Sequence, residues 1–324
     1  MSVRNKTSNS VLKIAALGAI AALALTGCAT NGGTTEPGTT EPTTATGTFD
    51  SGNPAYDALI NAGPVAADDV VAANKWATKI KESGVLRVGG TETSNLFSLL
   101  NPVTGKVVGF DAGLTQLLSR YILGDAKTEV LQVTSATREE VIKNNQVDLV
   151  AATYSITPKR LEQIDFAGPY YSSYAGILVK KDNTTIKGLA DLEGKIVATQ
   201  AGSTGVALLE GFAPKAEILA LPDQSQALLA VQQGRADAYV IDQSLLLTAV
   251  LNNPDLKVLD ETFGGEDPYG IGVSKDSDAK AFINDFLNTI IKDGTWLKLW
   301  KTTIQDRTGI EADPTLPVIG SAGN

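Results

Sequence analysis

The chain has 324 residues, of which 43% are hydrophobic and 19% charged, a composition typical of a globular protein with enough apolar material for a core. Its net charge of −9 excludes the basic surface that nucleic-acid binding requires. The sequence has no histidine and one cysteine, Cys28, which excludes Ser-His and Cys-His catalytic pairs, disulfides within the chain, and metal sites built on histidine or clustered cysteine. We therefore expect an acidic binding protein, or an enzyme that works with carboxylates, Lys, Ser or Tyr, with no metal or cofactor.

The N-terminal segment has the pattern of an export signal. Arg4, Lys6 and Lys13 precede an apolar run over residues 14–25, and these twelve residues are too few to span a hydrocarbon core of ~30 Å. We therefore predict a signal peptide over residues 1–27, rather than a buried helix. Once it is removed, 24 basic side chains remain against 36 acidic ones.

The segment Leu25-Thr26-Gly27-Cys28 resembles the bacterial lipobox, in which the cysteine is lipid-modified (palmitate) and becomes the mature N-terminus. The resemblance implies a lipid anchor at Cys28 on the extracytoplasmic face of the cell membrane; the alternative is a chance cysteine after an ordinary signal peptide. Residues 28–48 are mostly Thr, Gly, Pro and Glu, which predicts a flexible tether. Residues 49–83 predict a helical extension, with apolar side chains at helical spacing between Asp68 and Lys81.

From Gly84 onward, short apolar strands alternate with amphipathic stretches, which predicts α/β lobes with parallel sheets. We expect the first lobe over residues 84–181 and 267–310, the second over 182–266, and a tail over 311–324, so that the chain crosses between lobes at 181–183 and 263–267. The predicted strands cover 85–89, 128–133, 148–152, 174–180, 195–199, 217–221, 237–241 and 269–274. Helices are predicted at a cap on Asp111, over 137–145, from Pro158, after the turn 201–205, and over 225–233, 245–251 and 278–291, with a loop at 263–268.

Three segments at strand ends carry polar groups suited to a ligand, because ligands of open α/β sheets bind at the carboxyl ends of strands. Residues 152–160 end in Arg160, whose guanidinium can fork onto a carboxylate, although a solvated helix charge explains it equally. Residues 200–205 form a Gly-containing turn into a helix, which can approach an anion closely or be a simple tight turn. Asp242 can accept from an ammonium group or cap the next helix.

Residues 84–310 resemble the amino-acid-binding solute receptors of ABC importers, the bacterial extracellular solute-binding proteins of family 3. The resemblance rests on motifs in the family's order: Val85-Leu86-Arg87-Val88-Gly89, Gly109-Phe110-Asp111, Val147-Asp148-Leu149, Ser155-Ile156-Thr157-Pro158-Lys159-Arg160, Asp165-Phe166 with Pro169-Tyr170-Tyr171, Gln200-Ala201-Gly202-Ser203-Thr204, Gly234-Arg235-Ala236-Asp237-Ala238 and Pro268-Tyr269-Gly270-Ile271. It implies a two-lobe periplasmic-binding-protein-like fold (type II) with a discontinuous first lobe and the ligand in the interlobe cleft. It also implies a monomer that hands its ligand to a membrane permease served by an ATPase.

The resemblance further implies a role for each site residue. Arg160, with Ser203 and Thr204, takes the α-carboxylate of the ligand. Ser155, the carbonyl of Thr153 and Asp242 take its amino group.

The ligand side chain is expected to meet the loop after the first strand and the loop at 134–138. Ser135 and Arg138 resemble the glutamate/aspartate branch of the family, where a Ser and an Arg three residues later receive a side-chain carboxylate. Thr91 stands where some glutamate binders carry a second Arg. We therefore expect glutamate or aspartate, then asparagine or glutamine; the alternative for Arg138 is a helix-surface charge beside Glu139.

Three other functions are considered. Some relatives are dehydratases of cyclic carboxylates that use a carboxylic acid in the cleft, and Glu92 is a candidate for that acid. Ser277-Asp278-Ala279-Lys280 matches the S-x-x-K motif of penicillin-interacting enzymes, but no S-D-N or K-T-G motif accompanies it, and Ser277 fits better as a helix N-cap. A ligand-sensing module for a signalling receptor is the third.

Overall fold

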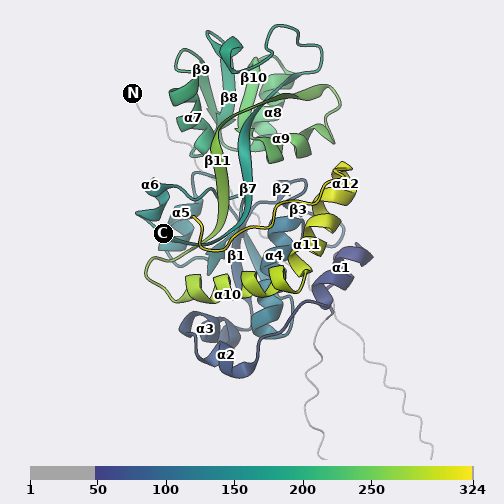
Figure 1. Ribbon diagram of the computed structural model, residues 1–324, viewed down its shortest axis with the longest axis vertical. Helices are drawn as coiled ribbons and strands as arrows, with labels where there is room; N and C mark the ends of the chain where they lie inside the picture. Colours follow the sequence, from purple (N-terminus) through teal and green to yellow (C-terminus); the bar gives the residue numbers. More distant parts are fainter. Residues whose placement is uncertain (1–47, 323–324) are drawn as a thin grey trace, which may run out of the picture. The chain divides into compact units, whose positions relative to one another are not determined.

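The computed structural model describes residues 48–322, so the expected signal peptide, Cys28 and nearly all of the tether lie outside the described residues. An eight-stranded sheet has the order β5-β1-β6-β11-β7-β10-β8-β9. At its centre, β7 (Asp165–Lys180) and β11 (Leu256–Val273) pair along their length as antiparallel strands (Figure 1). The outer strands pair in parallel, so the sheet is mixed and not the pair of parallel sheets that the alternating pattern predicts.

The outer strands fall into two groups on either side of the long pair. One group is β5 (Thr128–Gln132), β1 (Leu86–Gly90) and β6 (Leu149–Val150); the other is β10 (Ala238–Asp242), β8 (Ile196–Gln200) and β9 (Glu217–Leu221). A small second sheet holds β2 (Thr93–Ser94), β3 (Ser98–Leu100) and β4 (Val107–Val108).

The two long strands pass from one group to the other. On β7, Ala175–Leu178 pair with β10, whereas Asp165–Ala167 pair with the end of β11 that also meets β6. The first crossing therefore comes at Ser173–Ala175, earlier than the expected 181–183. The expected second crossing, at 263–267, coincides with a register shift between Phe263 and Asp267 of β11. We accordingly take 175–263 as lobe 2 and the described residues on either side of it as lobe 1.

The segment 263–268 is strand and not the loop that its Gly, Asp and Pro content predicts. One register shift lies inside this stretch, between Phe263 and Asp267, and another follows it, between Tyr269 and Ile271; Pro268 sits between the two, opposite Ser172. Such irregularities accommodate residues that a regular ladder excludes, since proline has no N–H to donate.

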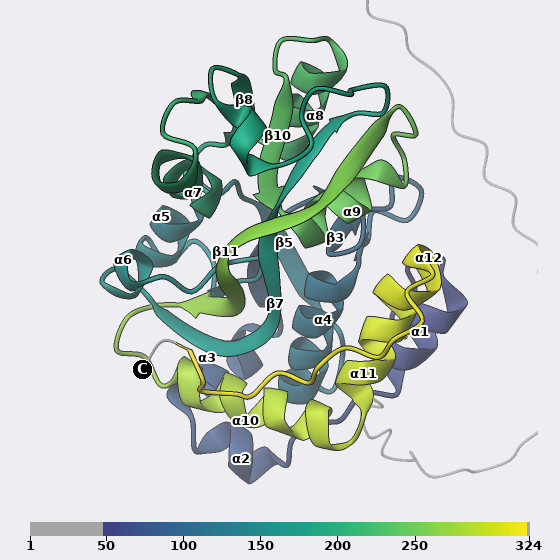
Figure 2. The ribbon, with the colours of Figure 1, turned by 45° about the horizontal axis from the view of Figure 1, so that its top comes forward.

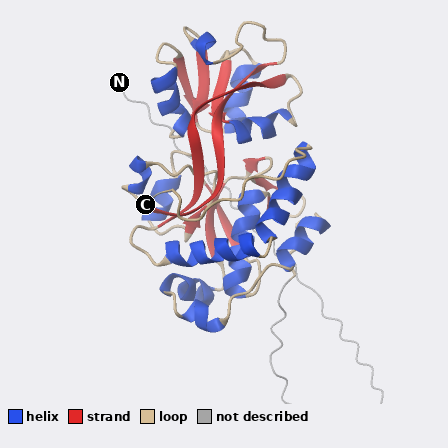
Figure 3. Cartoon of the chain, viewed as in Figure 1, coloured by secondary structure: helices blue, strands red, loops and turns tan. Residues whose placement is uncertain are grey.

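Helices cover the sheet in both lobes (Figure 3). In lobe 1 the principal ones are α4 (Phe110–Leu123), α5 (Arg138–Lys143), α6 (Pro158–Leu161), α10 (Ala279–Lys292), α11 (Thr295–Trp300), the π-helix η2 (Lys301–Gln305) and α12 (Asp306–Thr308). In lobe 2 they are the 3-10 helix η1 (Leu189–Leu192), α7 (Thr204–Phe212), α8 (Gln224–Gln232) and α9 (Gln243–Val250). Among residues 48–322, no helix has the length and apolarity needed to cross a membrane.

The segment before β1 is helical, as expected, but it forms three helices: α1 (Pro54–Asn61), α2 (Asp68–Ala72) and α3 (Lys75–Ser83). The single helix predicted between Asp68 and Lys81 is broken at Asn74, whose side chain caps α3 by accepting from Ala77 N–H. The carboxylate of Asp278 accepts from the first two N–H groups of α3, which ties this segment to the start of α10. Ser277 does not serve as the N-cap of α10; Asp278 occupies that position, and its side chain bonds α3 instead.

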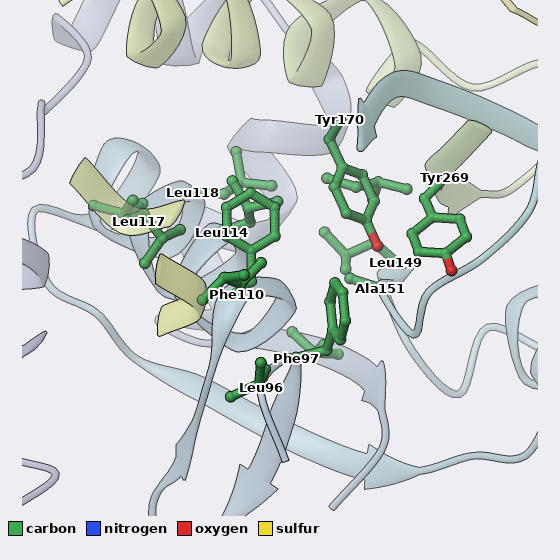
Figure 4. Packing of buried hydrophobic residues seen from close by; sticks show 14 of the residues in the cluster. Leu96, Phe97, Phe110, Leu114, Leu117, Leu118, Leu149, Ala151, Tyr170 and Tyr269 are labelled. Carbon is green, nitrogen blue, oxygen red and sulfur yellow. The ribbon is translucent and has the colours of Figure 1, made fainter. Parts of the chain in front are cut away.

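The larger core begins in lobe 1 and extends along the long strands to α8 and α9 of lobe 2. Tyr170 of β7 and Tyr269 of β11 project into a cluster with Phe97, Phe110 and Leu149 (Figure 4). Beyond α12 the chain returns across this lobe to β7, where Gly320 N–H donates to the carbonyl of Gly168 at 2.8 Å (Figure 2). The long strands are thus held by packing on both faces, which gives the ends of the strands a fixed position.

Candidate functional site

A cavity of about 70 Å³ lies between the lobes at the carboxyl ends of the parallel strands. Four expected site residues line it: Thr91 after β1, Ser135 and Arg138 after β5, and Thr153 after β6. Lobe 2 contributes Gln200 at the end of β8 and Pro222, Asp223 and Gln224 after β9. The cavity is far smaller than the ~300–1,000 Å³ of sites for drug-sized ligands, so it suits a small molecule that the lobes enclose.

Two arginines of lobe 1 share one aromatic ring. The guanidinium carbon of Arg138 lies 3.8 Å from the ring centroid of Tyr154, and that of Arg160 lies 5.1 Å from it. Both side chains are buried, with 3% and 7% of their surface exposed. Burial, and then repulsion from Arg160, lowers the pKa of Arg138 to about 10, so it still carries its charge at neutral pH. The cleft therefore has a positive wall.

Arg160 is positioned by the helix that the Thr-Pro pair starts. Thr157 caps α6 by accepting from the backbone N–H of Arg160, as the sequence predicts. The guanidinium of Arg160 donates to the carbonyl of Ser155 at 2.8 Å and, across the cleft, to the carbonyl of Gly202 at 3.0 Å. Glu139 lies 3.5 Å from its Nε. Arg160 therefore joins the lobes, and the alternative of a solvated helix charge is wrong.

Thr153 is held in a left-handed conformation, with φ of 45°, at the point where β6 ends. Asp111 stabilises this turn: its carboxylate accepts from Thr153 N–H at 2.7 Å and from the Tyr170 hydroxyl at 2.9 Å. The predicted cap role of Asp111 is wrong, because Gly109 is the N-cap of α4 and Asp111 sits buried in the first turn. Burial raises the pKa of Asp111 to about 7, and the bond from Thr153 opposes that rise.

Opposite the arginines lies a pair of carboxyl groups. Asp242 ends β10, is 4% exposed, and accepts from the Tyr269 hydroxyl at 2.7 Å. Asp242 occupies the N-cap position of α9, as the alternative predicts, but its side chain makes no capping bond there. Asp267 of β11 accepts from Ser155 of lobe 1 at 2.9 Å and from Thr204 of lobe 2 at 3.3 Å. Asp267 thus links two expected site residues, Ser155 of lobe 1 and Thr204 of lobe 2.

The turn between β8 and α7 meets lobe 1. Ser203 caps α7, accepting from Gly205 N–H and donating to the Gln200 carbonyl, so its hydroxyl is engaged within its own turn. The Ser135 hydroxyl donates to the Gln200 side chain at 3.4 Å, and Gln200 in turn donates to the Tyr239 hydroxyl. A methyl group on Gly202 would lie 2.9 Å from Cα of Ala136. The two lobes are therefore in contact along this edge.

Some buried polar atoms of the cleft lack a partner. Five such side-chain atoms occur in the part of the chain that the structure describes, and three belong to this region: Oγ of Ser94, Nε of Arg138 and Oδ1 of Asp242. Leaving such a group unpaired costs ~1–3 kcal/mol. Among the described residues, the donor cation of Arg138 and the hydroxyl of Ser94 thus lack polar partners at the lining of the small cavity, and the acceptor oxygen of Asp242, which is not part of that lining, lacks one in lobe 2.

The structure adds residues that sequence analysis missed. Tyr154 and Asp267 stand inside or beside the quoted motifs, but nothing in their spacing distinguishes them from core or turn residues. Glu92, the candidate acid of an enzyme, lines a different cavity with Lys106 and Gln116 of lobe 1 and is absent from the lining of the cleft. Within residues 48–322, no group of three or more acidic side chains is arranged to hold a metal ion.

Comparison with known proteins assigns this architecture. The chain is 39% identical over 213 residues to a glutamine-binding protein of Geobacillus stearothermophilus, covering 65% of this chain and 80% of that protein. It is 31% identical over 227 residues to the glutamate-binding protein GluB of Corynebacterium efficiens, covering 66% and 77%. The crystal structure of AncCDT-1, an ancestral amino acid-binding protein and a precursor of cyclohexadienyl dehydratase, superposes with a TM-score of 0.64 at 31% identity, covering 70% of this chain and 98% of that one. The two-lobe, type II periplasmic-binding-protein-like fold is thus confirmed. Since the model of the bacterial extracellular solute-binding proteins, family 3, also matches residues 86–305, the chain belongs to that family.

Proposed function

We propose that the chain is the extracytoplasmic amino-acid receptor of an ABC importer. We further propose that it binds glutamate or glutamine, or the shorter aspartate or asparagine, between its lobes. The observation that carries this proposal is the set of buried, unpaired polar atoms on opposite sides of the cleft, Nε of Arg138 and Oδ1 of Asp242, found within the described residues. A zwitterion with a polar side chain supplies an oxygen to the first and an ammonium group to the second. In this arrangement Arg160 and Thr204 receive the α-carboxylate, and Ser155, Thr153 and Asp242 receive the amino group.

The side chain is assigned to the part of the cavity that Arg138, Ser135 and Thr91 line. Arg138 donates to either a carboxylate or an amide oxygen, and Thr91 adds no second charge. The similarity to both glutamine-binding and glutamate-binding relatives supports the same pair of ligands.

A thermal-shift screen of the twenty amino acids on the purified protein tests the proposal. A ligand that binds only the folded state stabilises it by ~2.7 kcal/mol at one hundred times its Kd. We expect glutamate and glutamine to give the largest rise in melting temperature. A protein that responds to none of the twenty, or that prefers lysine, arginine or a branched aliphatic residue, would contradict it.

We also propose that the protein is not an enzyme. The acid that a dehydratase needs would have to reach the cleft, and Glu92 lies in the lining of another cavity. Incubation with prephenate- or arogenate-like substrates should therefore give no product. Co-purification with an ABC permease, against co-purification with a signalling receptor, distinguishes import from sensing.

The membrane anchor is a separate proposal that depends on Cys28, which lies outside the described residues. We propose that Cys28 carries the lipid and holds the receptor on the outer face of the cell membrane. Cys28→Ala should release the protein from the membrane fraction and leave its affinity for amino acids unchanged. Membrane association of that variant would contradict the anchor without touching the binding proposal.

A further inference from the structure

We propose that Asp267 pairs with Asp242 to form a proton-releasing site for the ligand's amino group. In the ligand-free protein the two carboxyl groups share one proton; the ammonium group takes its place, and the proton leaves to solvent. This inference rests on the proposed function, because it assumes that an amino acid binds in the cleft. It adds a residue, Asp267, and a chemical consequence, uptake that depends on pH.

The geometry brings the two carboxyl groups together. Asp242 and Asp267 are within hydrogen-bonding reach of each other, and a carboxyl–carboxylate bond of this kind requires one proton. The hydroxyl groups of Tyr269, Ser155 and Thr204 all donate to the pair, so they stabilise its negative charge without neutralising it. The remaining oxygen, Oδ1 of Asp242, is buried and unpaired within residues 48–322. That oxygen is the point at which an ammonium N–H can enter.

The surroundings of the pair explain its affinity for a proton. Burial, and then the charge of Asp267, raises the pKa of Asp242 to about 7, and burial also raises the pKa of Asp267. The charge of Arg138 lowers the pKa of Asp242 and that of Arg160 lowers the pKa of Asp267, but neither effect outweighs burial. The groups that face the pair from the neighbouring elements are Arg138, Ser155 and Arg160 of lobe 1, Thr204 of α7, Ser244 of α9 and Tyr269 of β11, with Glu139 behind Arg160.

A second cavity gives the proton a way out. It measures about 290 Å³ and is lined by Asp267, Thr157, Thr204 and the exposed Glu266. Asp267 therefore borders a cavity separate from the ligand cavity, and a proton can leave through it while the lobes remain in contact.

The sign of the pH effect follows. The bound state needs both carboxylates ionised, whereas the free state holds a proton below its pKa, so affinity rises with pH and levels off above that value. For one shared proton with the pKa of about 7 given for Asp242, the affinity falls about tenfold between pH 8 and pH 6. At pH 7, binding releases about half a proton per ligand.

Calorimetry of glutamine and glutamate binding, in buffers that differ in protonation enthalpy, measures this release directly. The variant is Asp267→Asn, which keeps a hydrogen-bonding side chain beside Asp242 but removes the second ionisable group. The matched control is Asp182→Asn, an exposed aspartate of lobe 2. We expect wild type and Asp182→Asn to release about half a proton at pH 7. Asp267→Asn should release clearly less and lose less affinity from pH 8 to pH 6, because Asp242 keeps the pKa rise caused by burial but not the part that the charge of Asp267 adds.

Two results would overturn the inference: a wild type that binds with no proton release between pH 6 and pH 8, or an Asp267→Asn variant that releases as much as wild type. The second result would assign the release to Asp242 alone or to Asp111, the other buried carboxyl group near the cleft whose pKa is raised to about 7. If Asp267→Asn does not fold, Asp267→Gln is measured in its place. If no amino acid binds to the wild type, the proposed function itself fails, which the calorimeter distinguishes from binding without release.

Discussion

Tyr154 determines how two cations of one lobe can lie side by side. Its ring faces the guanidinium groups of Arg138 and Arg160, and its hydroxyl donates to Glu139 at 3.0 Å. The π-face of Tyr154 and the carboxylate of Glu139 offset part of the free-energy cost of burying the two guanidinium charges. The ring therefore prepares the positive wall before any ligand arrives, and this lowers the reorganisation that binding requires.

Arg160 is expected to be essential for every amino-acid ligand, because the group it is proposed to bind is common to all of them. Arg160→Ala should reduce affinity by ~30-fold to over a thousandfold, corresponding to the ~2–5 kcal/mol lost when one side of a buried charge pair is removed. The affinity of Arg160→Lys should lie between those of wild type and Arg160→Ala, since lysine keeps the charge but not the forked donors. Calorimetry measures both, and a loss below threefold in Arg160→Ala would contradict the role.

Arg138 is expected to govern the choice between acid and amide. Arg138→Ala should weaken glutamate or aspartate at least tenfold more than glutamine or asparagine, because losing a charged partner in a desolvated site costs more than losing a neutral one. The control is Arg235→Ala, an exposed arginine of lobe 2 that bonds Gln233. Competition binding of the four ligands measures the difference. Equal losses of affinity for acid and amide would contradict the assignment of Arg138 to the ligand's side chain.

The turn between β8 and α7 is the element that brings lobe 2 against lobe 1. Gly202 has φ of 75° there, and an added methyl group would collide with the backbone of Ala136. Gly202→Ala should therefore hold the lobes apart and lower ligand affinity by tenfold or more. Isothermal calorimetry measures this change.

Gly194→Ala is the matched control for that variant. Gly194 has φ of 69°, so alanine suffers the same backbone strain, but no atom of the described chain lies within 4 Å of its added methyl group. Both variants should lose similar folding stability, ~1 kcal/mol, and Gly194→Ala should bind normally. Equal affinities in the two variants would mean that Gly202 does not limit closure.

The sequence predicted the ends of most outer strands to within a residue or two, because short apolar runs and helix caps are local signals. It missed the full length of β7 and β11, since Gly264, Gly265 and Pro268 have the composition of a turn. Gly264 and Gly265 lie within a register shift, and pairing of the flanking Phe263, Asp267 and Pro268 with β7 keeps the segment in the strand. The candidate site divides in the same way. Motifs located Arg160, Asp242 and Thr204, whereas Asp267 acquires its role only when β11 brings it between Ser155 and Thr204.

For the whole molecule, the two long strands provide the connections about which the lobes can move. The ladder between β7 and β11 is interrupted at three register shifts, the middle one between Phe263 and Asp267, so bending there breaks few hydrogen bonds. Contacts that close the cleft come from Arg160 to Gly202, Ser135 to Gln200, and Asn95 to the Thr248 carbonyl at 3.2 Å. Asp267 adds a further link, because its carboxylate accepts from both Ser155 and Thr204, so opening the cleft breaks these side-chain hydrogen bonds.

The last prediction concerns that motion. A cavity of about 70 Å³ enclosed by both lobes cannot admit an amino acid unless they separate, so the free protein must sample an open state and the ligand must favour the closed one. Small-angle X-ray scattering should therefore show a smaller radius of gyration at saturating glutamate or glutamine than without ligand. Gly202→Ala should show less compaction than wild type at the same ligand saturation, and Gly194→Ala should match wild type. A radius of gyration that stays constant on saturation of the wild type would contradict closure, because differential affinity for the closed state is the only means by which the ligand shifts this equilibrium.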